Sequence, residues 1–385
     1  MKHSGGCTAL ISVKLPLCKS IGAYAFSHYR RLDEACTALT AIDLPKCEVV
    51  GEFAFSGCTN LTSIDLPKCE AVGQYAFCAC TGLTAINLPA CTEVGEEAFT
   101  GCTGLTAINL PSCMSVGLSA FEVCTGLTSI DLPKCEAVGQ SAFYGCTGLT
   151  SINLPECTTV EFGAFYGCTN LTSIDLPKCE AVGQYAFSDC TGLTAINLPS
   201  RMSVGHGAFG GCTGLTSIDL PKCEAVGQSA FYGCTSLKSV NLPSCEVVAW
   251  AAFYGCTSLT NITIPSRVFY MEGYVFYGCS ELTQIYVSWV TPLSIPADVF
   301  EEVDTQNCTL YVPEGTLDKY KSADVWKDFG NIVEYDVTGI DNPDTDNGAT
   351  ETARYSANGQ RVAASVKGLN IVKYSDGSTR KVVVK

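Results

Sequence analysis

The chain has 385 residues, of which 47% are apolar and 16% are charged, so it can build a core and is not a disordered polymer. Its formal net charge of −15 argues against a nucleic-acid partner, because that binding depends on clustered Lys and Arg that neutralise phosphates. The sequence holds no apolar run of about 18 residues, so it predicts no transmembrane helix.

The first six residues, Met1 to Gly6, contain no apolar segment of the kind found in a signal peptide. A repeat is already under way at Cys7. Since a solenoid needs a capping unit over its exposed end, we expect a further N-terminal piece. A cytoplasmic location is the alternative.

From Cys7 onward the sequence repeats a unit of 22 residues. Eleven leucines from Leu39 to Leu259 keep this spacing, Leu10 precedes them by 29 residues, and Leu282 follows by 23. The longer first interval contains a seven-residue insertion at 28–34. These 13 units predict a repeat solenoid over residues 1–280.

Within each unit the apolar spacing is that of a leucine-rich repeat, L-x-x-I-x-L-x-x-C-x-x-V. Residues two apart share one face of a strand, so Ile64 and Leu66 point into the core and Asp65 points away. Stacked units then form a parallel sheet on the concave face, rising about 4.8 Å per unit. We expect the Ala76-Phe77 pair of each unit to bury its ring from a short helical or 3₁₀ turn on the outer face.

The 25 cysteines follow the repeat as well, with 13 in one column, ten in a second, and only Cys78 and Cys308 outside both. Zinc sites need four converging ligands, and the columns alternate every 11 residues with three histidines in the whole chain. Disulfides between neighbouring units are a further alternative, although Arg201 and Arg267 interrupt the second column. We favour small buried thiols that pack as apolar residues and predict no metal or other cofactor.

The outward-facing strand positions are the first candidate for a ligand surface. One column is Asp or Asn in ten successive units, and in several Asp units a Lys follows three positions later. Such a strip suits an extended ligand, whereas the alternative is that Asp and Lys only neutralise each other on a solvated sheet. The predicted ligand-binding residues are Asp43, Asp65, Asn87, Asn109, Asp131, Asn153, Asp175, Asn197, Asp219, Asn241, Lys68, Lys134, Lys178 and Lys222.

A second candidate is an aromatic stripe after the buried Phe of each unit. Exposed rings favour contact with carbohydrate or protein, although the rings can equally pack against the next turn. Its members are Tyr144, Tyr166, Tyr232, Tyr254, Tyr277 and the nearby Trp250. Any position-specific site should lie where the repeats lose uniformity, at residues 28–34, 201–206, 250 and 267–271.

Catalysis finds little support in this pattern. The histidines His3, His28 and His206 do not recur, and none lies near an obvious nucleophile or a pair of carboxylates. No phosphate-binding glycine loop or zinc motif is present. We therefore predict that the protein is not an enzyme.

The combination of L-T-x-I-x-L-P with a G-x-x-A-F-x-x-C turn resembles the BspA-like leucine-rich repeats of anaerobic bacteria of the gut and mouth. The resemblance covers roughly residues 7–290 and departs from the family at the cysteine after L-P-x. It implies a cell-surface or secreted adhesin that contacts host matrix proteins. An anaerobic habitat would also make free thiols tolerable in an exported protein.

The segments after the array are expected to be separate units. Residues 281–336 resemble the C-terminal cap of such arrays, and 337–353 are rich in Gly, Asp, Asn and Thr and indicate a linker. Residues 354–385 alternate apolar side chains with Asn-Gly and Asp-Gly turns, which predicts a small β module. This module has a net charge of +6 and resembles a type IX secretion sorting domain, which implies export.

Four functions therefore remain open, of which the preferred one is a monomeric surface protein that binds a host macromolecule. A glycan-binding surface protein would use the tyrosine stripe instead. An inert spacer would explain the uniformity of the repeats. An intracellular thiol-rich protein would explain the missing signal peptide.

Overall fold

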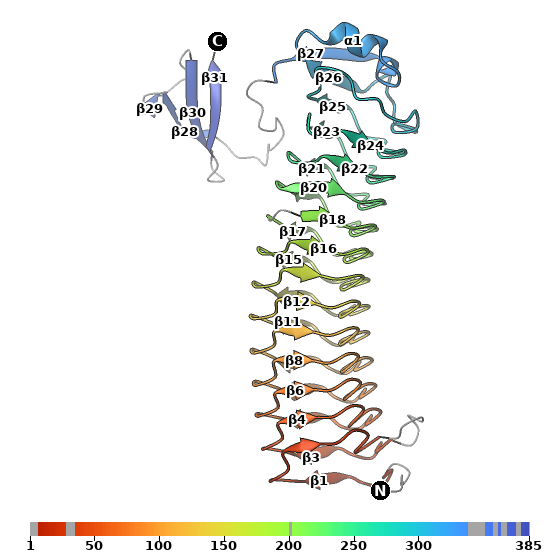
Figure 1. Ribbon diagram of the computed structural model, residues 1–385, viewed down its shortest axis with the longest axis vertical. Coiled ribbons are helices and arrows are strands. Elements are labelled where there is room, and N and C mark those ends of the chain that lie inside the picture. The colour runs from red at the N-terminus through yellow and green to blue at the C-terminus, as the bar shows by residue number, and fades with distance from the viewer. Residues whose placement is uncertain are drawn as a thin grey trace.

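The computed structural model is a parallel β-solenoid in which each repeat forms one turn, so the predicted leucine-rich-repeat architecture is confirmed (Figure 1). It describes residues 7–27, 35–199 and 202–337, together with the backbone of four strands within 351–384. The insertion at 28–34, Arg201, His3 and residues 338–350 of the predicted linker lie outside the described residues.

One side of the column carries the strands that the sequence predicted. Most show an exposed–buried–exposed pattern, because the central Ile or Val points into the core. The strands of this first face are β1 (Ser12–Lys14), β3 (Ala41–Asp43), β5 (Ser63–Asp65), β7 (Ala85–Asn87), β9 (Ala107–Asn109), β11 (Ser129–Asp131), β13 (Ser151–Asn153), β15 (Ser173–Asp175), β17 (Ala195–Asn197), β19 (Ser217–Asp219) and β21 (Ser239–Asn241).

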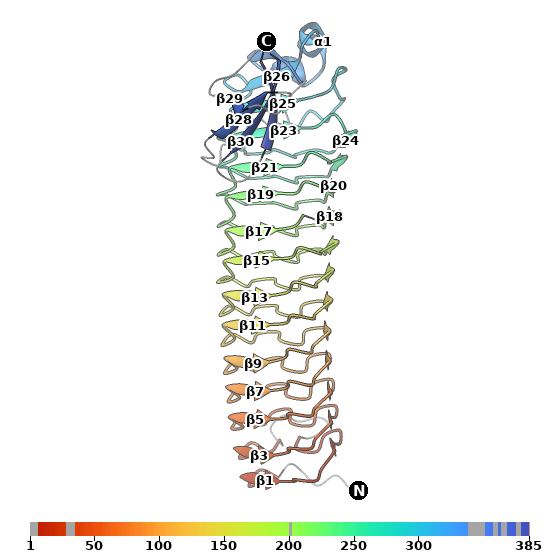
Figure 2. The ribbon, with the colours of Figure 1, turned by 90° about the vertical axis from the view of Figure 1, so that its left-hand side faces the viewer.

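A second parallel sheet, which the sequence did not predict, lies on another side of each turn (Figure 2). Its 12 strands form one continuous sheet, and its buried column is valine except for Ile21 in the first strand and Met271 in the last. They are β2 (Ser20–Ile21), β4 (Val49–Val50), β6 (Ala71–Val72), β8 (Glu93–Val94), β10 (Ser115–Val116), β12 (Ala137–Val138), β14 (Thr159–Val160), β16 (Ala181–Val182), β18 (Met202–Val204), β20 (Cys223–Val226), β22 (Val247–Val248) and β24 (Tyr270–Met271).

The expected helical turn around the Ala-Phe pair is wrong in detail. Within the described array this segment is a series of tight turns with no helix. The backbone N–H of Phe55 donates to the carbonyl of Ala76 in the next turn at 2.7 Å, and Phe77 donates to Ala98 at 2.7 Å. Because these donors bond along the stack, they are not available for bonds within a helical turn.

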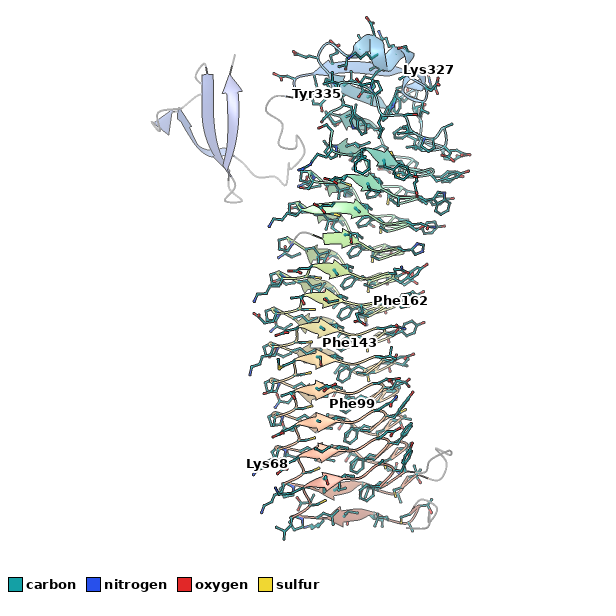
Figure 3. The ribbon with its side chains drawn as sticks, in the orientation of Figure 1. Lys68, Phe99, Phe143, Phe162, Lys327 and Tyr335 are labelled. Carbon is teal, nitrogen blue, oxygen red and sulfur yellow. The ribbon has the colours of Figure 1, made fainter. Side chains whose placement is uncertain are left out.

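The buried phenylalanines form the central ladder of the core. From Phe26 to Phe300, 13 rings stack face to face along the column with centroids 5.0–5.6 Å apart. Phe99 and Phe143 lie inside the column in Figure 3. Each turn thus buries one ring against both neighbours, which no isolated unit can do.

The column is nearly straight in both views, so the predicted concave face is flat (Figures 1 and 2). Leucine-rich repeats curve when helices, which pack 8–10 Å apart, occupy the side opposite strands that are about 4.8 Å apart. Here the opposite side is made of extended chain and tight turns, and its stacked rings repeat at 5.0–5.6 Å. Because the distance between consecutive turns is similar on all sides of the column, the stack does not curve.

At the C-terminal end of the solenoid, the last repeats and the segment after them form a sheet of four parallel strands: β23 (Asn261–Ile264), β25 (Gln284–Val287), β26 (Thr309–Pro313) and β27 (Asn331–Tyr335). The helix α1 (Leu317–Ser322) and the 3₁₀ helix η2 (Trp326–Asp328) cover this end. The Trp326 ring is fully buried and meets Phe300 edge-on at 5.8 Å, while its Nε1–H donates to the carbonyl of Leu293 at 2.8 Å. The aromatic ladder therefore ends against a perpendicular ring, consistent with a capping role for this segment.

The C-terminal segment forms a separate antiparallel sheet in the order β29–β28–β30–β31. Its strands are β28 (Glu351–Ser356), β29 (Arg361–Val362), β30 (Gly368–Tyr374) and β31 (Thr379–Val384). The resemblance of this unit to a sorting domain stays a prediction.

Candidate ligand-binding faces of the solenoid

The ten Asp and Asn residues of the predicted surface, here called the Asp/Asn strip, lie in one column on the first face. Parallel pairing places Asp65 beside Asn87 and Asn87 beside Asn109. Eight of the ten are exposed, and Asn87 and Asn241 are partly buried. The predicted strip is therefore a continuous feature of the surface.

Side-chain hydrogen bonds join the strip within short groups of turns. The Nδ2 of Asn87 donates to Oδ1 of Asp65 at 2.7 Å, and that of Asn109 donates to Oδ1 of Asn87 at 2.7 Å. The same bond links three further pairs at 2.7–2.8 Å, Asn153 to Asp131, Asn197 to Asp175 and Asn241 to Asp219. Each group begins with an Asp, which accepts, and continues with Asn, which donates.

The sheet weakens wherever a new group begins. Within the described residues no strand pairing joins β3 to β5, β9 to β11 or β17 to β19, and β13 pairs with β15 only at Asn153 and Asp175. Inside a group the Leu132 N–H donates to the carbonyl of Asn153 at 3.1 Å, a bond that Leu110 lacks toward Asp131. A further break, between β21 and β23, lies where the strip ends. We call the breaks before an Asp seams.

The chemistry of the strip explains the seams. The side-chain amide of Asn109 donates to Asn87, which leaves only its acceptor atom, Oδ1, for the next turn. The next strip residue, Asp131, is a carboxylate and also only accepts, so no hydrogen bond can form between the two side chains. At the first seam two carboxylates, Asp43 and Asp65, stand on consecutive turns, and like charges opposite each other are destabilising. We infer that at the four seams the strip residues oppose the pairing of the two strands; the break between β21 and β23, where Thr263 follows Asn241, does not involve an Asp.

The strip lysines do not pair with the strip aspartates in the described ranges. Lys178 instead forms an ion pair with Glu156 of the preceding turn, with Nζ and Oε2 2.5 Å apart. Lys68, Lys134 and Lys222 have exposed side chains, and Lys68 projects from the side of the column opposite Phe162 (Figure 3). Neutralisation of Asp by Lys is therefore not what organises this surface.

The cysteine columns lie under these surfaces as free thiols. All but Cys7, Cys18 and Cys78 are buried. In the first column each thiol from Cys58 to Cys279 donates to the carbonyl of a stacked Phe, as Cys146 Sγ does to Phe121 at 3.0 Å. In the second it donates two residues ahead, as Cys157 Sγ does to Thr159 at 3.3 Å. Burial raises the pKa of Cys146 and Cys157 to about 12, so they stay protonated and serve packing.

The predicted aromatic stripe divides into two stacks. Tyr144 stacks on Tyr166 at 5.1 Å, and Tyr254 stacks on Tyr232 at 4.9 Å and on Tyr277 at 4.4 Å. The corresponding positions of the two turns between the stacks hold Ser188 and Gly210. Trp250, 41% exposed, meets Tyr274 edge-on at 5.9 Å in a neighbouring column.

Between the two stacks lie residues that the sequence did not single out as a site. The rings of Phe162 and Tyr185 meet edge-on at 5.7 Å, and Tyr185 meets His206 at 4.9 Å. The only sequence signal was the loss of uniformity near His206, because none of the other repeats carries a His at this position.

Metal ligation and membrane insertion each need a specific arrangement of side chains. No group of three or more His, Cys, Asp or Glu side chains among the described residues is arranged to hold a metal ion. None of the described helices is long and apolar enough to cross a membrane.

The family of the repeats is shown by a match to the BspA type leucine rich repeat region over residues 32–135, 114–223 and 202–318. The chain belongs to the BspA-type leucine-rich-repeat family. The match spans both candidate faces and part of the C-terminal end of the solenoid. A search of curated proteins found no match to this chain.

Several solved structures are similar to this BspA-type chain. A leucine-rich repeat protein from Bacteroides ovatus is 25% identical, with a TM-score of 0.45 over 84% of this chain and 92% of its own. A leucine rich cell surface protein from Faecalibacterium prausnitzii is 22% identical, with a TM-score of 0.43 over 86% and 92%. The leucine-rich repeat protein of T. pallidum is 30% identical, with a TM-score of 0.39 over 40% and 77%.

Proposed function

We propose that this protein is an exported cell-surface protein that binds an extended region of a host matrix protein along the Asp/Asn strip. The observation that carries the proposal is the exposed strip itself, with acceptors left over at its seams. At the seam between β13 and β15, the Oδ1 of Asn153 and the carboxylate of Asp175 have no hydrogen bond joining them within the described residues.

These acceptors recur at about every second turn, a spacing of roughly 10 Å. They call for a partner that brings donors, such as Lys, Arg or backbone N–H groups, to a flat acidic surface. The charge of the chain agrees, because the part before the basic C-terminal module carries −21. Attraction of this kind speeds association and weakens as salt increases. Catalysis has no part in this proposal.

An inert spacer is the main alternative, since the Asn-to-Asp bonds satisfy part of the strip internally. The two functions differ in what removal of the seam charges does. We would replace Asp43, Asp65, Asp131, Asp175 and Asp219 together by Asn, and measure binding of the intact protein to immobilised fibronectin, laminin and collagen. We expect at least a tenfold loss of affinity for the bound matrix protein.

The matched control removes five charges from the turn side of the column, by changing Glu52, Glu96, Glu122, Glu301 and Glu302 to Gln. Both variants lose the same net charge, so only a strip-mediated contact distinguishes them. Equal losses in the two variants, or no binding by the wild type to any of the three proteins, would contradict the proposal.

A further inference from the structure

The side chains at the tight-turn edge vary from turn to turn, and three consecutive turns carry a set that leaves this edge open. The turn at 227–233, for comparison, carries Gln228, Ser229 and Tyr232 there. In the three turns these positions hold Phe162, Gly163 and Tyr166, then Gln184, Tyr185 and Ser188, then His206, Gly207 and Gly210. This edge lies on the side of the column where Phe162 projects, away from Lys68 (Figure 3).

Tyr185 and His206 form a fixed pair at this edge. The Tyr185 Oη and His206 Nε2 atoms are 2.5 Å apart. The Tyr185 ring lies over Gly207, where an added Cβ would come within 2.5 Å of the ring atom Cε1. Gly207 also has a φ of +59°, so glycine permits both the turn and the position of the ring.

A second polar pair lies in the adjacent column. Tyr166 donates a hydrogen bond to the carboxylate of Asp189, which raises the pKa of Tyr166 to about 12. A Cβ on Gly211 would lie next to Oδ1 of Asp189, so the carboxylate covers this glycine. Asp189 is exposed and has a φ of +58°, at a turn position that is glycine in most units.

Gly210 leaves one face of an aromatic ring uncovered. Tyr232 follows Gly210 in its column, and Tyr254 stacks on the other face of Tyr232 at 4.9 Å. Within the described residues no ring stacks on the face toward Gly210, and Tyr232 is 49% exposed. A flat group placed over Gly210 would meet Tyr232 at about the spacing of one turn, as Tyr254 does.

We propose that this edge is a carbohydrate site in which a neutral sugar ring lies over Gly210, stacks on Tyr232, and bonds to Asp189 and His206. A pyranose presents C–H groups on its face and hydroxyls at its rim, which matches an open aromatic face beside a carboxylate and an imidazole. A carboxylate on the sugar would be repelled by Asp189, so uronic and sialic acids do not fit. The site is independent of the Asp/Asn strip and of the matrix ligand proposed for it.

The decisive variant is Gly210→Tyr, which introduces the residue that five other turns carry at this position. Gly210 lacks a positive φ, and an added Cβ would stand 3.4 Å from the carbonyl oxygen of Gly207 and 3.6 Å from Ser188 Oγ, which is tight but tolerable. The new ring should stack on Tyr232 and occupy the place of the sugar without lowering the unfolding temperature. The matched control, Glu122→Tyr, extends the Tyr144 stack on the side away from the site.

The intact protein and both variants would be tested on an array of neutral glycans ending in galactose, glucose, mannose or N-acetylglucosamine, with sialylated glycans and proline-rich peptides alongside. We expect the wild type and Glu122→Tyr to bind a neutral class with equal affinity, and Gly210→Tyr to bind at least tenfold more weakly by titration calorimetry. Asp189→Ala should weaken the same binding several-fold. Binding by Gly210→Tyr at wild-type affinity, no wild-type binding to neutral glycans, or binding to the peptides alone would overturn the assignment.

Discussion

The two sheets of this solenoid have the same spacing and rest on the same core, yet one is continuous and the other is not. The second sheet pairs without interruption from β2 to β24, whereas the first face is divided into sheets of two to four strands. In the paired column, the outward positions of the second sheet hold Ala, Val, Ser, Thr, one Glu and one Tyr, as in Ala71, Glu93 and Tyr270. Those of the first face hold Asp or Asn in ten successive turns.

From this difference we infer that the side chains of one outward column influence backbone pairing in a parallel stack. Equivalent residues of consecutive turns lie about 4.8 Å apart. In a column made only of acceptors, each side chain therefore lies next to another acceptor, unless every second residue can donate a hydrogen bond. Asn supplies the donor within a group and Asp ends it. The column of the second sheet places no two carboxylates or amides on consecutive turns, and its sheet is continuous.

Alkaline pH should unfold both sheets together, because it acts on the buried thiols of the core that they share. We expect this change to lower the stability of the protein more than any of the substitutions below. Unfolded thiols ionise near pH 9, whereas burial raises the pKa of folded Cys146 and Cys157 to about 12. Stability is therefore fully present below pH 9 and is lost as the pH rises toward 12. Each such thiol contributes about 1.4 kcal/mol of loss per pH unit in that window.

Urea unfolding under reducing conditions, followed by far-ultraviolet circular dichroism from pH 8 to 11, would measure this loss. A Cys146→Ala, Cys157→Ala double variant should show a shallower decline with pH than the wild type. A urea midpoint that stays constant from pH 8 to 11 would contradict the claim that the thiols are buried and protonated.

Replacing Asn153 by Asp should open a new seam on the first face and leave the second sheet paired. The change removes the donor to Asp131 and places three carboxylates on consecutive turns. We expect a cost of about 1–2 kcal/mol and faster hydrogen exchange at the Leu132 amide. Exchange at Val160 of β14 should change little, and equal acceleration at both amides would show that the two faces do not respond separately.

The reverse change, Asp175→Asn, should close an existing seam and has the smallest expected effect. The new amide can donate to Oδ1 of Asn153, for a gain of about 0.5–1 kcal/mol and slower exchange at the Leu154 amide. Ser173→Asn, on the same strand but outside the strip, serves as the control. A seam variant no more stable than this control would indicate that the missing side-chain donor does not cause the break.

The repeat period and its apolar spacing alone determined the solenoid, the buried Leu, Ile, Cys, Val and Phe columns, and the exposure of the Asp/Asn strip. Each of these follows from the periods of the chain, because residues two apart share a strand face and equal residues one period apart stack. The same reasoning predicted a helical turn and a concave face. Both were wrong, because inter-turn hydrogen bonds such as Phe55 to Ala76 replace the helix that would have bent the stack.

Only the tertiary structure decided which hydrogen bonds and ring contacts the side chains of neighbouring turns make with one another. Which Asn donates to which Asp, where β9 loses its pairing with β11, and how Tyr185 comes to lie on Gly207 depend on atoms a whole turn apart in sequence. A sequence period aligns residues but does not state the direction of a hydrogen bond or the face a ring leaves open. Those contacts, more than the repeat, distinguish one surface of this column from another.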